Sequence, residues 1–248
     1  MFMWSPNVAH RAKRFLMRSR RQFYSLRAYV PGFREHHRLE SMVGPLGFWN
    51  KLQQYQLQLL QMNGLKPHHR LLDIGCGPLQ GGIAIIRYLE ANKYTGIEVD
   101  PVRIDAARSQ IARHRLESKN PQLFVSSTLG HTELHDQSFE FMWASQILYY
   151  FDDVIMTRLF AMIRERLAPD GRFLGDTLSP DHYEFTHPEQ PGKYIRHTHE
   201  ALSTLAAPFG LLVRELGAIS KYGYPRRLSL RTNLLFEITI AKNSRMEG

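Results

Sequence analysis

The stretch from Arg70 to Asp100 places the strongest constraint on how this chain can fold. It opens with an apolar run at residues 71–74, breaks at Gly75-Cys76-Gly77-Pro78, continues in a helical pattern, and ends in a second apolar run that stops at Glu98. A strand, a glycine turn, a helix and a second strand closed by an acid form one βαβ unit, which binds a nucleotide-type ligand at the carboxyl ends of its strands. We expect Pro78 in the first turn of the helix, where its missing N–H costs nothing.

The spacing of the glycines separates two kinds of ligand. The chain reads Gly75-x-Gly77-x-x-x-Gly81, whereas dinucleotide-binding turns read G-x-G-x-x-G, so the pyrophosphate signature is imperfect. Asp73 precedes the first glycine by two residues. D-x-G-x-G with an acid closing the next strand resembles motifs I and II of the class I S-adenosylmethionine-dependent methyltransferases. A nicotinamide-binding Rossmann domain is the alternative for the same unit.

The resemblance implies where a cofactor binds. In that family the glycine turn packs against the methionine and ribose part of S-adenosyl-L-methionine, and a carboxylate at the end of the second strand can accept hydrogen bonds from both ribose hydroxyls. Leu79 stands where family members often have a third glycine, which leaves the shape of the turn open. The cofactor-binding residues predicted in this unit are Asp73, Gly75, Cys76, Gly77 and Glu98.

Three weaker cofactor contacts follow from the resemblance, which runs from about residue 65 to 176. Thr128 and Leu129 follow the third predicted strand, where the family often places an acid for the adenine amino group, so hydroxyl or backbone groups must make that contact. Ala144 ends the fourth strand, which with the following residues resembles the family's fourth-strand motif. Trp49 precedes the first strand, and it either stacks on the cofactor or packs in the core.

Helical and strand patterns alternate along most of the chain. We therefore predict an α/β fold with a doubly wound, mainly parallel seven-stranded sheet, whose last strand is antiparallel by family order, and an N-terminal helical extension. Residues 177–198 contain three prolines and are predicted to be an irregular loop with a function. Helices are predicted at 50–63, 101–117, 152–167 and 199–207, and strands at 71–74, 94–97, 123–126, 139–144, 172–176, 211–216 and 234–241.

Length and composition favour one soluble domain with an extension. A chain of 248 residues can bury roughly 70–75% of the surface that its unfolded form exposes. The mean hydropathy is −0.35, and no apolar run approaches the ~18 residues that span a bilayer. The chain has one cysteine, Cys76, which can form no intrachain disulfide. A reducing cytoplasm is therefore the expected location.

Positive charge is concentrated at the N-terminus. Residues 1–38 hold nine Lys/Arg and one acid, a net +8 of the total +9, so the remaining 210 residues are nearly neutral. Residues 8–30 have a basic amphipathic helical pattern, which suits peripheral contact with an anionic membrane, an organellar targeting peptide, or a helix packed on its own domain. We predict an extension at 1–49 and a cofactor-binding domain at 50–248. Nucleic acid is not an expected partner, because the domain itself lacks strong positive charge.

Methyl transfer places few demands on side-chain chemistry. The sulfonium leaving group is already activated, so a protein must chiefly align donor and acceptor and sometimes remove a proton. Tyr149, Tyr150, Asp176 and His182 lie where a substrate-side base or hydrogen bond could be placed. Core packing explains the tyrosines equally well, and a solvated loop explains the histidine.

Several kinds of site are disfavoured by specific absences. Ala144-Ser145-Gln146 stands where enzymes that methylate adenine amino groups carry an asparagine-proline-proline-aromatic motif, and the single cysteine excludes a cytosine-C5 enzyme with a cysteine nucleophile. No metal is expected, because Asp176 is the only carboxylate at the ends of the fourth and fifth strands. His197 and His199 with His182 or His187 are the alternative set of zinc ligands.

We therefore expect an S-adenosyl-L-methionine-dependent methyltransferase that modifies an oxygen or nitrogen of a small or medium-sized acceptor. Two other functions remain open at this point. One is a non-catalytic cofactor-binding adaptor at a membrane or partner surface, and the other is a nicotinamide-dependent oxidoreductase.

Overall fold

The computed structural model describes residues 34–179 and 194–241. Within it the chain divides into two compact units between Trp49 and Asn50. The basic amphipathic pattern at 8–30 lies outside the described residues, as do His182 and His187. None of the described helices is long and apolar enough to cross a membrane.

The described part of the first unit is a helix and a capped turn. Helix α2 (Arg34–Val43) carries a two-pronged ion pair in which Arg38 donates to Glu35 over 2.8 and 2.9 Å. The carboxylate of Glu40 accepts from the backbone N–H groups of Gly47 at 2.9 Å and Trp49 at 3.2 Å. One buried acid thus fixes the turn that contains Gly44, Pro45 and Gly47.

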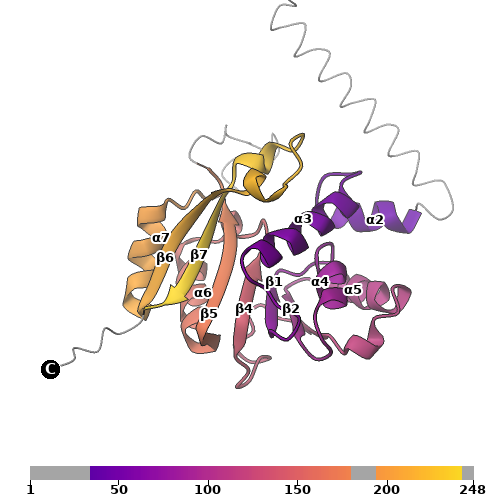
Figure 1. Cartoon of the computed structure of the whole chain (residues 1–248), viewed down its shortest axis with the longest axis horizontal. Coiled ribbons are helices and arrows are strands. Elements are labelled where there is room, and N and C mark those ends of the chain that lie inside the picture. The colour runs from indigo at the N-terminus through magenta and orange to yellow at the C-terminus, as the bar shows by residue number, and fades with distance from the viewer. Residues whose placement is uncertain (1–33, 180–193, 242–248) are drawn as a thin grey trace, which may run out of the picture. The chain divides into compact units, whose positions relative to one another are not determined.

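The second unit is built on a seven-stranded sheet with the order β3-β2-β1-β4-β5-β7-β6. Figure 1 shows these strands side by side, with β6 and β7 at one end and β1 and β2 toward the other. Strand β7 runs antiparallel to both β5 and β6, while β1 to β5 pair in parallel. The predicted fold class is confirmed. The strands are β1 (Leu71–Ile74), β2 (Tyr94–Glu98), β3 (Gln122–Val125), β4 (Phe139–Ala144), β5 (Leu167–Thr177), β6 (Leu211–Ala218) and β7 (Leu234–Ile240).

Helices α6 (Asp153–Arg166) and α7 (His199–Ala206) cover one face of this sheet. Their apolar residues form one buried cluster with the residues of β1, β4, β5 and β7 that point to that face, among them Leu72 and Met142. The neighbouring residues in these strands point the other way because side chains alternate along a strand. Asp73, Trp143 and Asp176 therefore share the opposite face, where Trp143 donates to Gln56 of α3 (Trp49–Met62) at 3.2 Å.

Side-chain caps start the helices that follow strand ends. Asp100 accepts from Val102 N at the start of α5 (Pro101–Arg113), and Pro101 occupies its first turn. Asp152 caps α6 by accepting from Ile155 N, and Thr198 caps α7. Each cap satisfies an N–H that has no partner within its helix, so the start of the helix is determined locally.

Several element boundaries differ from the sequence prediction, most of them by one or two residues. Helix α4 (Gly82–Tyr88) begins after Pro78, which lies in the preceding turn. Helix α5 ends at Arg113, because Arg115 takes a left-handed conformation, φ +55°. Strand β3 begins and ends one residue earlier than predicted. Strand β5 starts at Leu167 and includes the predicted turn at 169–171, since Leu167 already pairs with Phe139 ahead of a register shift.

Gly96, in the middle of β2, leaves no room for a side chain. A Cβ at this position would lie 2.8 Å from Cys76 Sγ and 2.9 Å from Leu123 Cδ2. We expect Gly96→Ala to lower the free energy of unfolding by about 1–3 kcal/mol, the usual cost of overpacking a core. Urea titration measures this change. An unaltered midpoint and slope would show that the glycine turn and β3 can shift without cost.

Candidate functional site

The turn after β1 fits between the ends of β2 and β4. The N–H groups of Gly75 and Cys76 both donate to Ile97 O, at 2.8 and 3.1 Å. Gly75 and Gly77 have φ of +70° and +53°, a region that glycine enters without the penalty of a Cβ. A Cβ on Gly75 would lie 3.0 Å from Ile147 Cδ1, just beyond β4. Two glycines therefore let the backbone of this turn run close to both neighbouring strand ends.

Leu79 keeps the conformation that a glycine would have. Its φ is +63°, and the left-handed region costs a non-glycine residue roughly 1–2 kcal/mol. Its side chain is fully buried, which contributes roughly 1.5–3 kcal/mol. The substitution of the third glycine thus changes how the turn is packed and leaves its left-handed backbone in place.

Asp73, at the end of β1, is a buried acid with one strong partner. Tyr94 donates its hydroxyl to Asp73 Oδ2 at 2.6 Å. Burial raises the pKa of Asp73 to about 7, and the nearby charge of Glu98 acts in the same direction, whereas the hydrogen bond from Tyr94 lowers it. The protonation state of Asp73 is consequently sensitive to any charge that comes near the turn.

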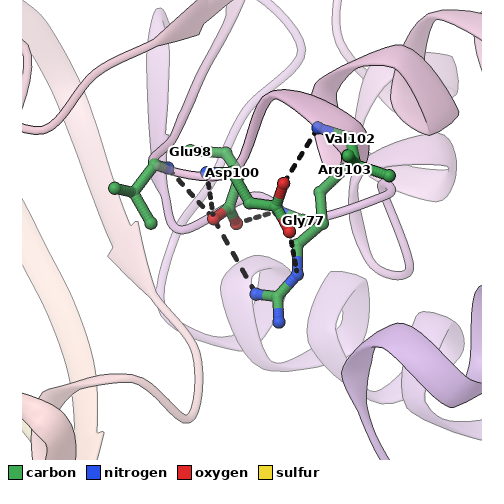
Figure 2. Close-up of polar contacts among 6 residues, drawn as sticks. Gly77, Glu98, Asp100, Val102 and Arg103 are labelled. Atoms are coloured by element: carbon green, nitrogen blue, oxygen red, sulfur yellow. Dashed lines mark hydrogen bonds and ion pairs between the residues drawn. The ribbon is translucent and has the colours of Figure 1, made fainter.

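Glu98 ends β2 with a buried carboxylate that faces the glycine turn, as Figure 2 shows. Its Oε2 accepts from Gly77 N at 3.1 Å, and its Oε1 accepts from Val99 N at 3.0 Å and Asp100 N at 3.2 Å. A carboxylate has about four acceptor positions. Oε1 is thus already fully used by backbone donors, and Oε2 keeps capacity for a further donor.

Arg103 lies beside this carboxylate on the first turn of α5. Its guanidinium is 3.8 Å from Glu98 Oε1 and 3.6 Å from Asp100 Oδ2 (Figure 2). Because Arg103 is more than one third exposed, solvent screens these ion pairs and their contribution to stability is small. The arrangement holds the acids at the end of β2 in place while one oxygen of Glu98 remains able to accept.

Comparison with known families identifies this region. Residues 72–173, from β1 into β5, match a family model described as a methyltransferase domain. The matched stretch includes the glycine turn and Glu98, and the match is consistent with the class I methyltransferase superfamily. No curated protein matches the chain in sequence.

Three similar solved structures agree with this chain in fold. Magnesium protoporphyrin IX methyltransferase from Synechocystis PCC 6803 aligns with a TM-score of 0.60 and 14% identity over 87% of this chain and 98% of its own. An S-adenosylmethionine-dependent methyltransferase from Clostridium acetobutylicum gives 0.58 and 11% over 78% and 92%. The CcbJ methyltransferase from Streptomyces caelestis gives 0.58 and 14% over 80% and 92%. At these identities the likeness shows the fold.

The other predicted cofactor residues lie in three separate parts of the chain. Thr128 is exposed and its N–H lies 3.3 Å from Ser126 Oγ, which also accepts from Gly130 N. Leu129, between them, has φ +55°, so a short turn follows β3. Ala144 is the buried last residue of β4. Trp49 belongs to the first unit, where its ring meets His36 edge-on, so its predicted stacking on the cofactor stays a prediction.

The predicted catalytic residues differ in burial and in hydrogen-bond partners. Asp176, near the end of β5, is fully buried and accepts from Gln146 N and Asn233 Nδ2, both at 2.8 Å. Burial raises its pKa to about 6, and these two donors oppose the rise. Tyr149 lies close enough to Asp176 to feel its charge. Burial and then this charge raise the pKa of Tyr149.

Tyr150 and Tyr149 form an aromatic cluster with Tyr194. Both lie on the short helix η2 (Leu148–Tyr150), and ring centroids in the cluster are 4.7–5.4 Å apart. Tyr149 is buried and Tyr150 is 43% exposed. Burial raises the pKa of Tyr150 to about 12, so neither tyrosine is ionised near neutral pH. His182, the fourth predicted residue, lies outside the described residues.

The two described histidines of the alternative zinc set make backbone hydrogen bonds. His197 Nε2 lies 2.8 Å from Phe151 O, and His199 Nε2 lies 3.1 Å from Val213 O. A carbonyl oxygen only accepts, so both rings donate through Nε2 and keep only Nδ1 for a metal. Within residues 34–179 and 194–241 no three His, Cys, Asp or Glu side chains are placed to hold a metal ion.

Sequence reasoning missed four residues that support the site, two of which had a signal in the sequence. Tyr94 could have been found from strand register, since Asp73 pairs with Gly96 and residues two apart in β2 share a face. Arg103 follows the acids of β2 at a spacing of one helical turn from Asp100, which is the usual signal for an ion pair. Gln146 and Asn233 gave no such signal, because they meet Asp176 only through the folded sheet.

Proposed function

We propose that this protein is an S-adenosyl-L-methionine-dependent methyltransferase acting on an oxygen or nitrogen of a small or medium-sized acceptor. The observation that carries the proposal is the buried carboxylate of Glu98 beside the Gly75–Gly77 turn. A methyltransferase domain matched over residues 72–173 supports the same activity.

The residues at the ends of β1 and β2 fit the cofactor's chemical groups. A ribose diol offers hydroxyl donors, and Glu98 Oε2 has capacity to accept one while Oε1 is already used by two backbone donors. The cofactor also carries positive charge, which suits two adjacent acids, Asp73 and Glu98. The glycine turn lacks the β-carbons that would block an approach along its backbone. When bound, S-adenosyl-L-methionine supplies an activated methyl group.

The protein's own part is alignment. Residues at the ends of β1 and β2 hold the cofactor. The segment after β4 lies beside them, because a Cβ on Gly75 would come within 3.0 Å of Ile147. Bringing two reactants into one geometry lowers the barrier without any charged catalytic group. The tyrosines of η2 then serve as neutral hydrogen-bonding groups and Asp176 as the available proton acceptor.

Incubation with methyl-labelled S-adenosyl-L-methionine and fractionated cell extract tests the proposal. We expect label to pass into a small or medium-sized compound in one fraction, and not into RNA or lipid. Absence of transfer by a preparation that binds the cofactor would instead favour a non-catalytic, cofactor-binding adaptor.

Turnover should not depend on a divalent metal. The described residues bring no three metal-ligating side chains together, and His197 and His199 are each used by a backbone carbonyl. We expect methyl transfer to persist in EDTA at an unchanged rate. A loss of activity that magnesium or zinc restores would refute this and direct attention to His182 and His187.

A further inference from the structure

A cluster of polar side chains, all buried except the half-buried Gln146, lies at the carboxyl ends of β4 and β5. We call Tyr55, Gln146, Asp176, Tyr224 and Asn233 the Asp176 cluster. Asp176 accepts from Gln146 N and Asn233 Nδ2, and Gln146 Nε2 donates to the Tyr224 hydroxyl at 2.9 Å. The ring of Tyr55 meets that of Tyr224 edge-on, with centroids 5.0 Å apart.

Two polar atoms of this cluster lack a hydrogen-bond partner among the described residues: the hydroxyl of Tyr55 and Oδ1 of Asn233. Their residues are 2% and 0% exposed. The orientation of the Asn233 amide is fixed, because Nδ2 must face the Asp176 carboxylate. Buried polar groups normally have partners, so we take these two atoms as hydrogen-bonding positions open to a ligand. Since an amide oxygen only accepts, that ligand carries an N–H or O–H.

The charge of the cluster restricts the chemical class of the ligand further. Burial and then the charge of Asp176 raise the pKa of both Tyr55 and Tyr224. No lysine or arginine of the described residues contributes to either change. An anionic group would be repelled by Asp176, while an ammonium would be stabilised. The cluster therefore suits an amine better than a carboxylate or phosphate.

The cluster is also adjacent to the proposed cofactor turn. Ile147, which a Cβ on Gly75 would meet at 3.0 Å, directly follows Gln146. Gln146 has φ +56°, an unusual backbone conformation for a residue other than glycine, and it connects Asp176 to Tyr224. A ligand bound to the cluster would thus lie close to a methyl donor held at the turn.

Resting on the proposed methyltransferase function, we propose that the Asp176 cluster binds the amino group of the acceptor. Asn233 Oδ1 and Asp176 accept hydrogen bonds from its N–H groups, and the Tyr55 hydroxyl forms a further hydrogen bond with the same amino group. An ammonium has no lone pair with which to attack the methyl group, so it must first lose a proton. One N–H bond breaks, its electron pair stays on nitrogen, and the proton passes to Asp176, whose carboxylate becomes a carboxylic acid.

Entry of an amine requires a local opening, because Asp176 and Asn233 are both fully buried. Residues 194–197 lie against this region: Ile195 N donates to Tyr149 O at 2.7 Å, and Thr177, next to Asp176, lies 3.5 Å from His197 O. Displacement of these residues would open the cluster to an amine.

Calorimetry on the full chain tests this inference in two stages. S-adenosylhomocysteine is titrated first, because failure of this ligand to bind would contradict the proposed function itself. Methylamine, benzylamine, benzyl alcohol and benzoate are then titrated into the complex. We expect at least one amine to bind, and benzoate to bind at least roughly tenfold more weakly than benzylamine, the effect of one lost charge-assisted hydrogen bond.

Three variants separate binding from folding. Tyr55→Phe should weaken amine binding by roughly tenfold with no loss of thermal stability, because the hydroxyl that it removes has no protein partner. Asp176→Asn should remove the preference for benzylamine over benzyl alcohol. Tyr88→Phe, which removes a hydroxyl bonded to Leu65 O elsewhere, is the control and should leave amine binding unchanged.

Three results would overturn the inference while S-adenosylhomocysteine still binds. These are equal or tighter binding of benzoate, unchanged amine affinity in Tyr55→Phe, and no binding of either amine. In the last case the unpaired atoms of Tyr55 and Asn233 serve only the fold.

Discussion

Replacing Glu98 with alanine should weaken cofactor binding by about 1.5–3 kcal/mol, which is roughly 10- to 150-fold in affinity. The buried carboxylate accepts from Gly77 N and has capacity for a ribose hydroxyl on the same oxygen. Alanine removes both the acceptor and the contact that holds the turn against β2. Calorimetric titration of S-adenosylhomocysteine into both proteins measures the difference.

Glu140→Ala is a matched control for this change. Glu140 lies near the amino end of β4, away from the carboxyl ends of the strands that form the site. There its carboxylate accepts hydrogen bonds from the backbone and side chain of Arg70. We expect its loss to leave cofactor affinity unchanged, whatever its effect on stability. If Glu98→Ala binds as tightly as the unmodified protein, Glu98 is a structural acid that only organises the turn.

Asp73 should make the ligand-free protein less stable as the pH rises from about 4 to about 7. The unfolded chain releases this proton near pH 3.8, whereas the folded protein keeps it until about pH 7. The unfolded state therefore binds fewer protons in this window, so the free energy of unfolding falls with increasing pH. The difference of about three pKa units corresponds to at most about 4 kcal/mol.

Asp73→Asn isolates this contribution, because the amide oxygen can still accept from Tyr94. Relative to the unmodified protein, the variant should gain stability between about pH 4 and about pH 7 in urea titrations, and the difference should level off above that range. Asp176, with a pKa of about 6, adds a similar decline in both proteins and cancels in the difference. Tyr94→Phe removes the bond that lowers the Asp73 pKa and should move the decline to higher pH. A difference independent of pH would mean that Asp73 ionises normally.

The βαβ unit was predictable because its signals are local. The alternation of apolar runs with a glycine turn determines β1, α4 and β2, and a strand-end acid follows directly from the chain order. The antiparallel β7 came from family resemblance, and the structure confirms it. The cap Asp100 likewise explains why the start of α5 at Pro101 was predicted, whereas its end was predicted at 117 and lies at Arg113.

The acceptor side of the site could not be predicted in the same way. The five residues of the Asp176 cluster come from α3, the segment after β4, β5, and the segment between β6 and β7, so only the folded sheet brings them together. The left-handed backbone at Gln146 and the register shift in β5 depend on packing and have no periodic signal. Long-range hydrogen bonds of this kind are set by tertiary structure.

The most direct test of the account compares two cofactors on the same protein. Calorimetric titrations of S-adenosyl-L-methionine and of NADH distinguish a methyltransferase site at the Gly75 turn and Glu98 from a nicotinamide site with an unusual glycine spacing. We expect S-adenosyl-L-methionine to bind at one site per chain and NADH to bind far more weakly or not at all. Tighter binding of NADH would contradict the account of the β1–β2 site.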